Sequence, residues 1–421
     1  MRALRVYFDD RYAGSLTQDD AGSLSFAYAA TYLADRQSRA ISFAMPLREY
    51  GYEDRIARPY FSGLLPDEGA RRRLAAALGV SAENPFGLLE IIGGDCAGAL
   101  SLYPSGVEPA FPAVERARWL RGEELAELVE RLELRPLLAG EHGLRLSLAG
   151  AQNKLAVCAR KDAIGIAQDG APTTHILKPP ITALDGTVEN ELFCLRLASR
   201  LRLPVAHAEL RHAGSMPLLL VERYDRATLN GRVHRLHQED FCQALSVSPE
   251  LKYEVEGGPG VSQSLALIDR ACARPAADRL GFVRGLIYQY LIGNADGHAK
   301  NYALLYRGVA PDLAPFYDLL CTAVYPRLSK ALAMRIGGRN MPDTIRLDDW
   351  ATVLAPGRTA SRILERELLG LATRIGPEAD RLLEEFAAAG IVHPLLVRIR
   401  RLIETRRTHV LRMIEKARPR E

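Results

Sequence analysis

Apolar and polar residues alternate over positions 2–26, in the stretches ALRVYFDD and SLTQDDAGSLSF, around turn-forming Asp and Gly. A period of two is typical of short antiparallel strands with one buried face. The pattern predicts a small β-rich lobe at the amino terminus. This lobe continues through Pro66 and Asp67, which are well placed to begin a helix, and through the apolar stretch 84–103.

A cluster of prolines, Pro104, Pro109 and Pro112, marks a change in composition, and we place the first boundary there, at 110/111. The segment that follows mixes helical and strand patterns, which predicts an α/β lobe over 111–225. Its helices are predicted at 119–134 and 189–201, and its strands at 155–160, 174–178, 204–210 and 217–225.

Helical periodicity dominates from about Phe241 onward, most clearly over 277–293 and in the last part of the chain. A loop at 294–301 and short strands near 302–306 and 313–318 interrupt it. The pattern as a whole predicts an α+β fold in three segments: a β-rich 1–110, a mixed 111–225 and a mainly helical 226–421.

Composition agrees with a compact globular protein. At 421 residues the chain is longer than a single core usually supports, and its 48% hydrophobic and 25% charged residues are average values. Its six cysteines occur singly, without zinc-binding spacing, which indicates a reducing compartment and no structural metal. Charge interrupts the amino terminus and no apolar stretch is long enough to span a membrane, so we expect a cytoplasmic protein that does not bind membranes.

The net charge of +4 is too small to indicate nucleic acid as the main partner. From Pro394 to the end, however, nine Lys and Arg face three Glu, a local net charge of +6. A solvated helix face is the ordinary interpretation of such a run, and a phosphate-binding surface is the alternative.

The stretch GNADGHAKN follows an apolar helix and precedes a strand. Asp296 and Asn301 in it have the Asp-x-x-x-x-Asn spacing by which protein kinases place a proton acceptor and a metal ligand. His298 and Lys300 add a polar and a cationic group beside them. The alternative is that these Asn and Asp residues form an ordinary turn that caps the end of the preceding helix.

Two further residues agree with phosphoryl transfer. Asp318 ends the apolar segment LAPFYD, where a kinase carries its second metal ligand, although a strand-terminal Asp also begins ordinary turns. Lys178 lies in the apolar strand THILK, where an inward ammonium would need an anionic partner such as a phosphate. The prolines that follow it also suit an edge strand with Lys178 pointing outward.

The turn SLAGAQNK leads into a strand, an arrangement in which backbone N–H groups can approach phosphates closely. It has a single glycine, Gly150, so an ordinary hairpin turn is the alternative. Farther along, the chain leaves an apolar strand through Glu222 and Tyr224, where a two-lobed kinase has its adenine-binding hinge. Either Glu189 or Glu191 could pair with Lys178, and acidic residues also simply favour helix amino termini.

Seven motifs in one order resemble the HipA family of bacterial kinase toxins: SLAGAQNK, THILK, LVERYDR, QEDFCQAL, KYE followed by GGPG, GNADGHAKN and YDLL. FSGLLPDEG and NPFGLLEIIGGDCAGAL are similar to the amino-terminal lobe of that family. The resemblance implies a two-lobed protein-kinase-like fold, distantly similar to phosphoinositide kinases, that uses ATP and Mg²⁺ to phosphorylate a protein hydroxyl.

By position, the resemblance implies that Asp296 is the catalytic base and that Asn301 and Asp318 bind Mg²⁺. Ser147 matches the serine that family members autophosphorylate to inactivate themselves. A dianion there would repel ATP phosphates from the adjoining loop. The residues implied for ATP binding are Ala149, Gly150, Ala151, Gln152, Asn153, Lys154, Lys178, Glu222, Tyr224, His298, Lys300, Asn301, Tyr317 and Asp318.

The resemblance also implies partners. Family members are held by a DNA-binding antitoxin, HipB, in a complex that represses its own operon, and the best-known target is an aminoacyl-tRNA synthetase, glutamyl-tRNA synthetase. Contact with operator DNA would then be indirect, through the antitoxin. Two other functions stay open: a catalytically silent co-repressor subunit, and a small-molecule kinase, because phosphoryl-transfer residues do not encode the acceptor.

Overall fold

The computed structural model describes residues 1–109, 116–134, 137, 145–150, 152–161, 163–168, 170–354 and 357–417. Within them the chain forms two compact units. The first consists of Met1–Pro179, Arg211–Leu251 and Ala303–Asp312, and the second of Pro180–Leu210, Lys252–Tyr302 and Leu313–Glu421. The boundary predicted at 110/111 lies outside the described residues, and the division into 1–110, 111–225 and 226–421 remains a prediction.

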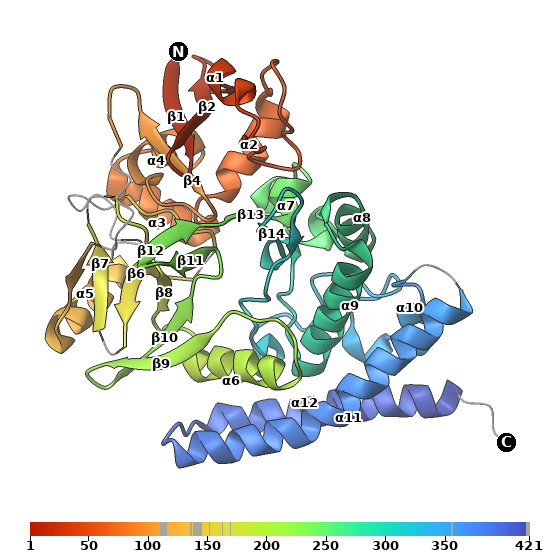
Figure 1. The fold of residues 1–421 in the computed structure, drawn as a ribbon. Coiled ribbons are helices and arrows are strands. Elements are labelled where there is room, and N and C mark those ends of the chain that lie inside the picture. Colours follow the sequence, from red (N-terminus) through yellow and green to blue (C-terminus); the bar gives the residue numbers. More distant parts are fainter. Residues whose placement is uncertain are drawn as a thin grey trace. The chain divides into compact units, whose positions relative to one another are not determined.

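An antiparallel four-stranded sheet forms the amino-terminal part of the first unit (Figure 1). Its strands, in the spatial order β3-β2-β1-β4, are β1 (Arg2–Phe8), β2 (Arg11–Gln18), β3 (Leu24–Tyr28) and β4 (Leu100–Pro104). Along β3, Leu24, Phe26 and Tyr28 are buried while Ser25 and Ala27 are exposed. This alternation confirms the short antiparallel strands predicted over 2–26.

Four helices accompany this sheet: α1 (Ala30–Ala34), α2 (Asp54–Gly63), α3 (Glu68–Leu78) and α4 (Pro85–Ile92). Helix α3 begins directly after Asp67, as predicted. Helix α4 begins with Pro85, and the Asn84 side chain accepts a hydrogen bond from the Gly87 N–H, which satisfies one of the free donors of the first turn. Helices α2 and α4 contact each other. Helix α2 also contacts strand β3, and helix α4 contacts strand β4.

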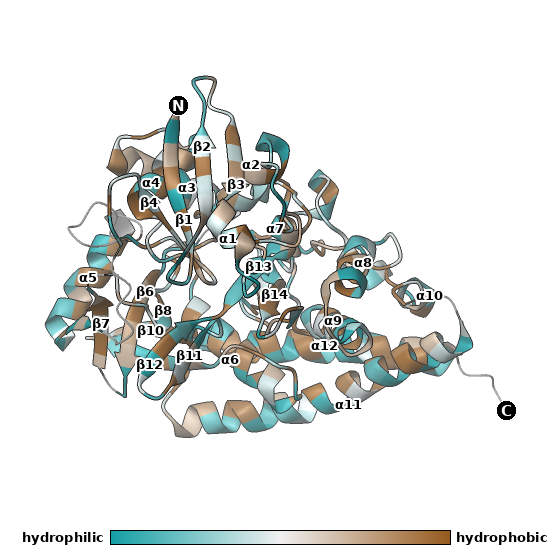
Figure 2. Cartoon of the chain, turned by 45° about the horizontal axis from the view of Figure 1, so that its top comes forward, coloured by the Kyte–Doolittle hydropathy of each residue, from teal (hydrophilic) through white to brown (hydrophobic). Residues whose placement is uncertain are grey.

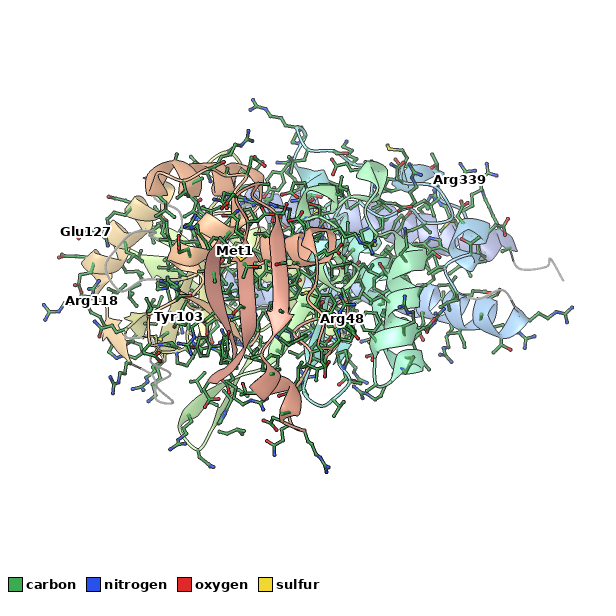
Figure 3. All side chains as sticks on the ribbon, turned by 90° about the horizontal axis from the view of Figure 1, so that it is seen from above. Met1, Arg48, Tyr103, Arg118, Glu127 and Arg339 are labelled. Carbon is green, nitrogen blue, oxygen red and sulfur yellow. The ribbon has the colours of Figure 1, made fainter. Side chains whose placement is uncertain are left out.

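A six-stranded sheet follows, in the order β5-β7-β6-β8-β10-β9. Its strands are β5 (Ala117–Trp119), β6 (Leu155–Arg160), β7 (Ala163–Ala167), β8 (His175–Lys178), β9 (Ala208–Ala213) and β10 (Met216–Glu222). Helix α5 (Gly122–Leu134) is amphipathic: Leu125, Leu128 and Leu132 are buried, whereas Glu127 is exposed and projects outward in Figure 3. One hydrophobic cluster joins residues of both sheets, including Phe26 and Leu155, so they share a core.

The remaining strands among the described residues are β11 (Arg226–Leu229), β12 (Arg232–Arg235), β13 (His237–Asp240), β14 (Ala303–Tyr306) and β15 (Asp312–Leu313). A short helix α7 (Phe241–Ala244) follows β13. The strand predicted at 313–318 is wrong. Only Asp312–Leu313 is a strand, followed by an isolated bridge between Phe316 and Val205. Pro315 has no N–H to donate and Asp318 has a left-handed backbone, with φ of 51°, and both features end a regular ladder.

The second unit is mainly helical. It contains α6 (Thr187–Arg200), α8 (Val261–Ala271), α9 (Pro275–Ile292), α10 (Leu347–Ala351), α11 (Arg358–Ala388) and α12 (Pro394–Ala417), with 3₁₀ turns at Glu254–Glu256, Ala299–Asn301, Thr322–Val324 and Pro342–Thr344. Apolar and polar residues follow each other with a helical period along α11 (Figure 2), and its buried stripe includes Leu364, Leu368 and Leu371. Helices α11 and α12 lie side by side. No helix within the described part of the chain is both long and apolar enough to cross a lipid bilayer.

A network of buried charges ties β10, β11 and β12 to the segment after α4 in the first unit. Asp95 Oδ1 lies 2.8 Å from Arg226 Nη2 and 3.4 Å from Arg235 Nε, and Asp95 Oδ2 lies 3.4 Å from Arg223 Nη1. Asp225 Oδ2 lies 2.8 Å from Arg223 Nη2. Burial alone would raise the pKa of Asp95, but the three guanidinium groups hold that pKa well below its ordinary value.

Replacing Asp95→Asn should strongly destabilise the first unit, because three buried guanidinium groups would then face one carboxylate. Removing one partner of a buried ion pair costs about 3–5 kcal/mol. Thermal unfolding should show a clearly lower midpoint for this variant, whereas Asp20→Asn, at a side chain that is 99% exposed, should unfold like the wild type. Equal midpoints for the two variants would contradict a structural role for the network.

A second buried carboxylate, Glu239 on β13, fixes a loop of the amino-terminal part. It accepts hydrogen bonds from Ser42 Oγ at 2.6 Å, the Phe43 N–H at 2.8 Å and Tyr306 Oη at 2.5 Å. Burial raises the pKa of Glu239 from 4.5 to about 7, although these three donors favour the carboxylate.

The stability of the protein should therefore depend on pH through Glu239. Its pKa is higher in the folded than in the unfolded chain, so its contribution is fully present below about pH 4.5 and is lost as the pH rises to about 7. The loss is on the order of 3 kcal/mol, from a rise in pKa from 4.5 to about 7. Glu239→Gln should remove this pH dependence of the urea unfolding midpoint between pH 4.5 and 7, since Ser42 Oγ can accept a hydrogen bond from the new amide. Glu49→Gln, at an exposed side chain, should leave the pH dependence unchanged. An unchanged slope in Glu239→Gln would refute this assignment.

Candidate active site

The loop after α9 is built from glycines and buried amides of the second unit. Gly293 ends the helix with φ of 73°, and a Cβ there would lie 2.5 Å from Leu402 Cδ2, so only glycine fits. Asn294 Nδ2 donates to Gln289 Oε1 at 3.0 Å, while Asn294 Oδ1 accepts from the Asp296 N–H at 3.0 Å. Gln289 also donates to Tyr302 Oη at 2.7 Å. The backbone of Asp296 is thus fixed to the end of a buried helix.

The side chain of Asp296 is exposed at the end of this buried framework. Its Oδ1 accepts a hydrogen bond of 2.5 Å from Tyr253 Oη. The Tyr253 ring in turn meets the His298 ring edge-on, with 5.0 Å between ring centroids. A carboxylate oriented in this way, and open to an incoming hydroxyl, is suited to act as a general base.

Asn301 and Asp318 lie on neighbouring segments of the same unit. Tyr317 Oη donates to the Lys300 carbonyl at 2.6 Å, which joins the two segments. Asn301 is buried, and its Oδ1 accepts no hydrogen bond from any described residue. An unsatisfied buried carbonyl is costly in a folded protein, and Asp318 adds a half-buried carboxylate held in a left-handed backbone. Oxygen donors of these two kinds fit a divalent cation such as Mg²⁺.

The predicted phosphate loop lies in the first unit and leads into β6, as expected. Gly150 has φ of 108°, and Lys154 Nζ donates to the Ala149 carbonyl at 2.8 Å, which closes the loop. Gln152 Nε2 donates to the Pro179 carbonyl at 3.1 Å, and Asn153 Oδ1 accepts from Arg73 Nη2 at 3.1 Å. Ala151 lies outside the described residues.

Ser147 and Lys178 are both buried in this unit. Ser147 is fully buried, and its Oγ donates to the Leu64 carbonyl at 2.7 Å. Lys178, the last residue of β8, is only 4% exposed, so the alternative of an outward-pointing edge lysine is wrong. A buried ammonium of this kind requires anionic or polar partners.

The predicted hinge follows the end of β10, as expected. Glu222 is exposed and lines a polar cavity of about 600 Å³ in the first unit together with Arg160 and His175. Tyr224 Oη donates to Gln238 Oε1. Arg223, which precedes Tyr224, and Asp225, which follows it, belong to the buried charge network. The backbone at the predicted hinge is therefore held on both sides of Tyr224.

The predicted site residues fall into two groups. The second unit brings together Asp296, His298, Lys300, Asn301, Tyr317 and Asp318, and the first unit contains Ser147, Ala149, Gly150, Gln152, Asn153, Lys154, Lys178, Glu222 and Tyr224. Sequence reasoning assigned no role to Tyr253 or Gln289. No spacing rule links Tyr253 to Asp296, which is 43 positions away, but Tyr253 lay inside the motif KYE and Asn294 inside the motif GNADGHAKN.

Comparison with known proteins covers both parts of the chain. A family model described as the HipA N-terminal domain matches residues 4–103, and one described as the HipA-like C-terminal domain matches residues 146–384. The chain belongs to the HipA family. The family resemblance inferred from the motifs is therefore confirmed.

Individual relatives of this HipA-family chain support the same family assignment. The Sinorhizobium fredii protein named "Putative kinase Y4mE" is 43% identical over 91% of this chain and 93% of its own length. The serine/threonine-protein kinase toxin HipA of Shewanella oneidensis is 30% identical over 89% of this chain and 88% of its own. A chain in the solved complex of Shewanella oneidensis HipA, HipB and operator DNA superposes on this chain with a TM-score of 0.84 and is 26% identical to it. The match covers 99% of this chain and 100% of the chain in the complex.

This HipA-family chain is thus a protein kinase, and its predicted α+β, kinase-like fold with a β-rich amino-terminal region and a helical carboxy-terminal end is confirmed. Kinases as a class use a nucleoside triphosphate and a divalent cation. The oxygen donors that Asn301 and Asp318 supply agree with that requirement.

Gly297→Ala should reduce phosphoryl transfer at least about tenfold, because misplacing a catalytic group by 1 Å is enough for such losses. A Cβ at Gly297 would lie 1.8 Å from Gln289 Oε1, and Gln289 cannot withdraw without losing its bonds to Asn294 and Tyr302. Gly370→Ala on α11 is the matched control, since its Cβ would meet no atom within 4 Å. Steady-state kinase rates that fall equally in both variants would contradict this account of the loop.

Proposed function

We propose that the chain transfers the γ-phosphoryl group of ATP to a serine or threonine hydroxyl of a protein, with Mg²⁺, as the toxin of a HipA/HipB-type toxin–antitoxin system. The observation that carries the proposal is the arrangement at 296–301. One loop holds an exposed, oriented carboxylate at Asp296 and an unsatisfied buried amide oxygen at Asn301. Kinase chemistry needs both groups at that spacing.

In the proposed reaction, Asp296 accepts the proton of the acceptor hydroxyl. The acceptor oxygen forms a bond to the γ-phosphorus, and the bond between that phosphorus and the bridging β-oxygen breaks. Asn301 and Asp318 would hold Mg²⁺, which would neutralise negative charge on the phosphates. Lys178 and the loop Ala149–Lys154 would bind phosphate oxygens, while Glu222 and Tyr224 would contact adenine. His298, Lys300 and Tyr317 would line the nucleotide site.

The burial of Ser147 supports its proposed role in self-inactivation. A phosphate carries about −1.5 to −2 charges, and such a group has no place where Ser147 Oγ now donates to the Leu64 carbonyl. A phosphorylated Ser147 would have to leave this position and would displace the adjoining phosphate loop. The modification would thereby prevent further ATP binding.

The proposed partners are a HipB-like antitoxin, operator DNA bound indirectly through it, and an aminoacyl-tRNA synthetase as substrate, glutamyl-tRNA synthetase by resemblance. The Shewanella oneidensis complex with HipB and operator DNA supports the first two. The basic helix α12 adds little direct support, because Arg400, Arg406 and Arg407 pair with Asp380, Asp343 and Glu404 of the same unit. Arg401, Arg412 and Lys416 remain exposed on α12.

The test is the intact mass of purified protein incubated with ATP and Mg²⁺. The wild type should gain one phosphate, mapped to Ser147, and Asp296→Ala should gain none because no group then accepts the hydroxyl proton. Ser147→Ala should gain none either, yet it should still phosphorylate a target protein in a bacterial lysate.

Phosphate on Asp296→Ala would exclude Asp296 as the catalytic base. A wild type that carries no phosphate before or after incubation would favour the catalytically silent co-repressor. Transfer to small metabolites and to no protein would favour the small-molecule kinase.

A further inference from the structure

A cavity of about 390 Å³ opens beside Asp296 within the second unit. Apolar side chains make up most of its lining. Residues that define it include Tyr253, Val255, Asp296, Leu328, Leu332 and Ala333. Since Asp296 is the proposed base, whatever enters the cavity lies next to the acceptor hydroxyl.

The mouth of the cavity exposes apolar surface to water. Of the lining residues, Val255 is 59% exposed and Leu328 is 36% exposed, whereas Leu332 and Ala333 are buried. Large apolar side chains clustered at a concave site favour being covered by an apolar group. Val255 lies on the 3₁₀ turn after Tyr253, whose hydroxyl binds Asp296, so one short segment connects the mouth to the proposed base.

The charge of the lining argues against a nucleotide here. Among the described residues that line the cavity, Asp296 is the single charged one, and no Lys, Arg or His is present. A phosphate would be repelled by the carboxylate and would find no cation. An uncharged, apolar group suits the lining, and the volume exceeds that of one side chain.

We propose that this cavity binds an apolar side chain, of leucine or phenylalanine size, adjacent to the acceptor serine or threonine in the protein substrate. Successive Cα atoms are about 3.8 Å apart, so in a peptide that bends at the acceptor the hydroxyl can reach Asp296 while the next side chain enters the cavity. In a fully extended peptide the two side chains would point to opposite faces. Val255, Leu328 and Leu332 then determine specificity. This inference rests on the proposed protein-kinase function and names the feature by which the substrate is chosen.

The test uses short peptides that carry one central serine and differ only in an adjacent residue, which is Leu, Phe, Ala, Asp or Lys. Initial rates are measured with the full, phosphatase-treated protein. The wild type should show a kcat/KM at least about tenfold higher for leucine or phenylalanine peptides than for aspartate or lysine peptides, a ratio typical of an apolar pocket. In Leu328→Asp and Val255→Asp the leucine-to-lysine ratio should fall at least about tenfold, because a carboxylate then faces the peptide.

Val392→Asp is the matched control, since Val392 is 76% exposed in the same unit and does not line the cavity. It should keep the wild-type ratio. Equal use of leucine and aspartate peptides by the wild type, or a ratio that falls no further in Leu328→Asp than in Val392→Asp, would overturn the proposal. So would self-phosphorylation at Ser147 with no transfer to any peptide. Absence of all transfer, self-phosphorylation included, would instead overturn the proposed function.

Discussion

The buried charges around Asp95 are the constraint on which the part of the first unit that carries the predicted hinge depends. Arg223 and Arg226, which follow the end of β10, are neutralised by Asp225 and by Asp95, a carboxylate from the amino-terminal sheet region. Arg235, which also pairs with Asp95, completes the cluster. Buried ion pairs add little net stability compared with apolar packing, but they are demanding in geometry. The amino-terminal region is therefore needed to fix the backbone at the predicted hinge, and the shared hydrophobic core has the same effect.

The predicted catalytic loop, residues 293–301, is stabilised in a different way. The carboxylate of Asp296, the predicted base, is exposed, and the backbone that carries it is fixed by buried neutral groups: Gln289, Asn294 and the hydroxyl of Tyr302. Such a chain of amides has no net charge to disturb the site, and each amide both donates and accepts. One oxygen, on Asn301, is left over. The loop thus combines a rigid support with an unsatisfied amide oxygen at which a cation would fit.

Local patterns were enough to predict much of this molecule. The strands at 2–26 and 155–160 and the helix at 277–293 follow from periodicity, and the Asp296 to Asn301 spacing identified a loop that the structure shows to be rigidly held. The partners of Asp95 could not be predicted, since Arg223 lies 128 positions away and no local pattern records such a pairing. The strand at 313–318 failed because Pro315 and the left-handed Asp318 outweighed an apolar run. The burial of Ser147 also depends on tertiary contacts, here with Leu64.

That burial has a kinetic consequence. A hydroxyl that is completely covered can react only in the fraction of molecules in which its segment has opened. Under the proposed self-inactivation, the rate at which a population silences itself would be the intrinsic transfer rate multiplied by that open fraction. The local stability of the contact between Ser147 and Leu64 would then set the lifetime of the active toxin. Tighter packing around this one hydrogen bond would lengthen the time before self-inactivation.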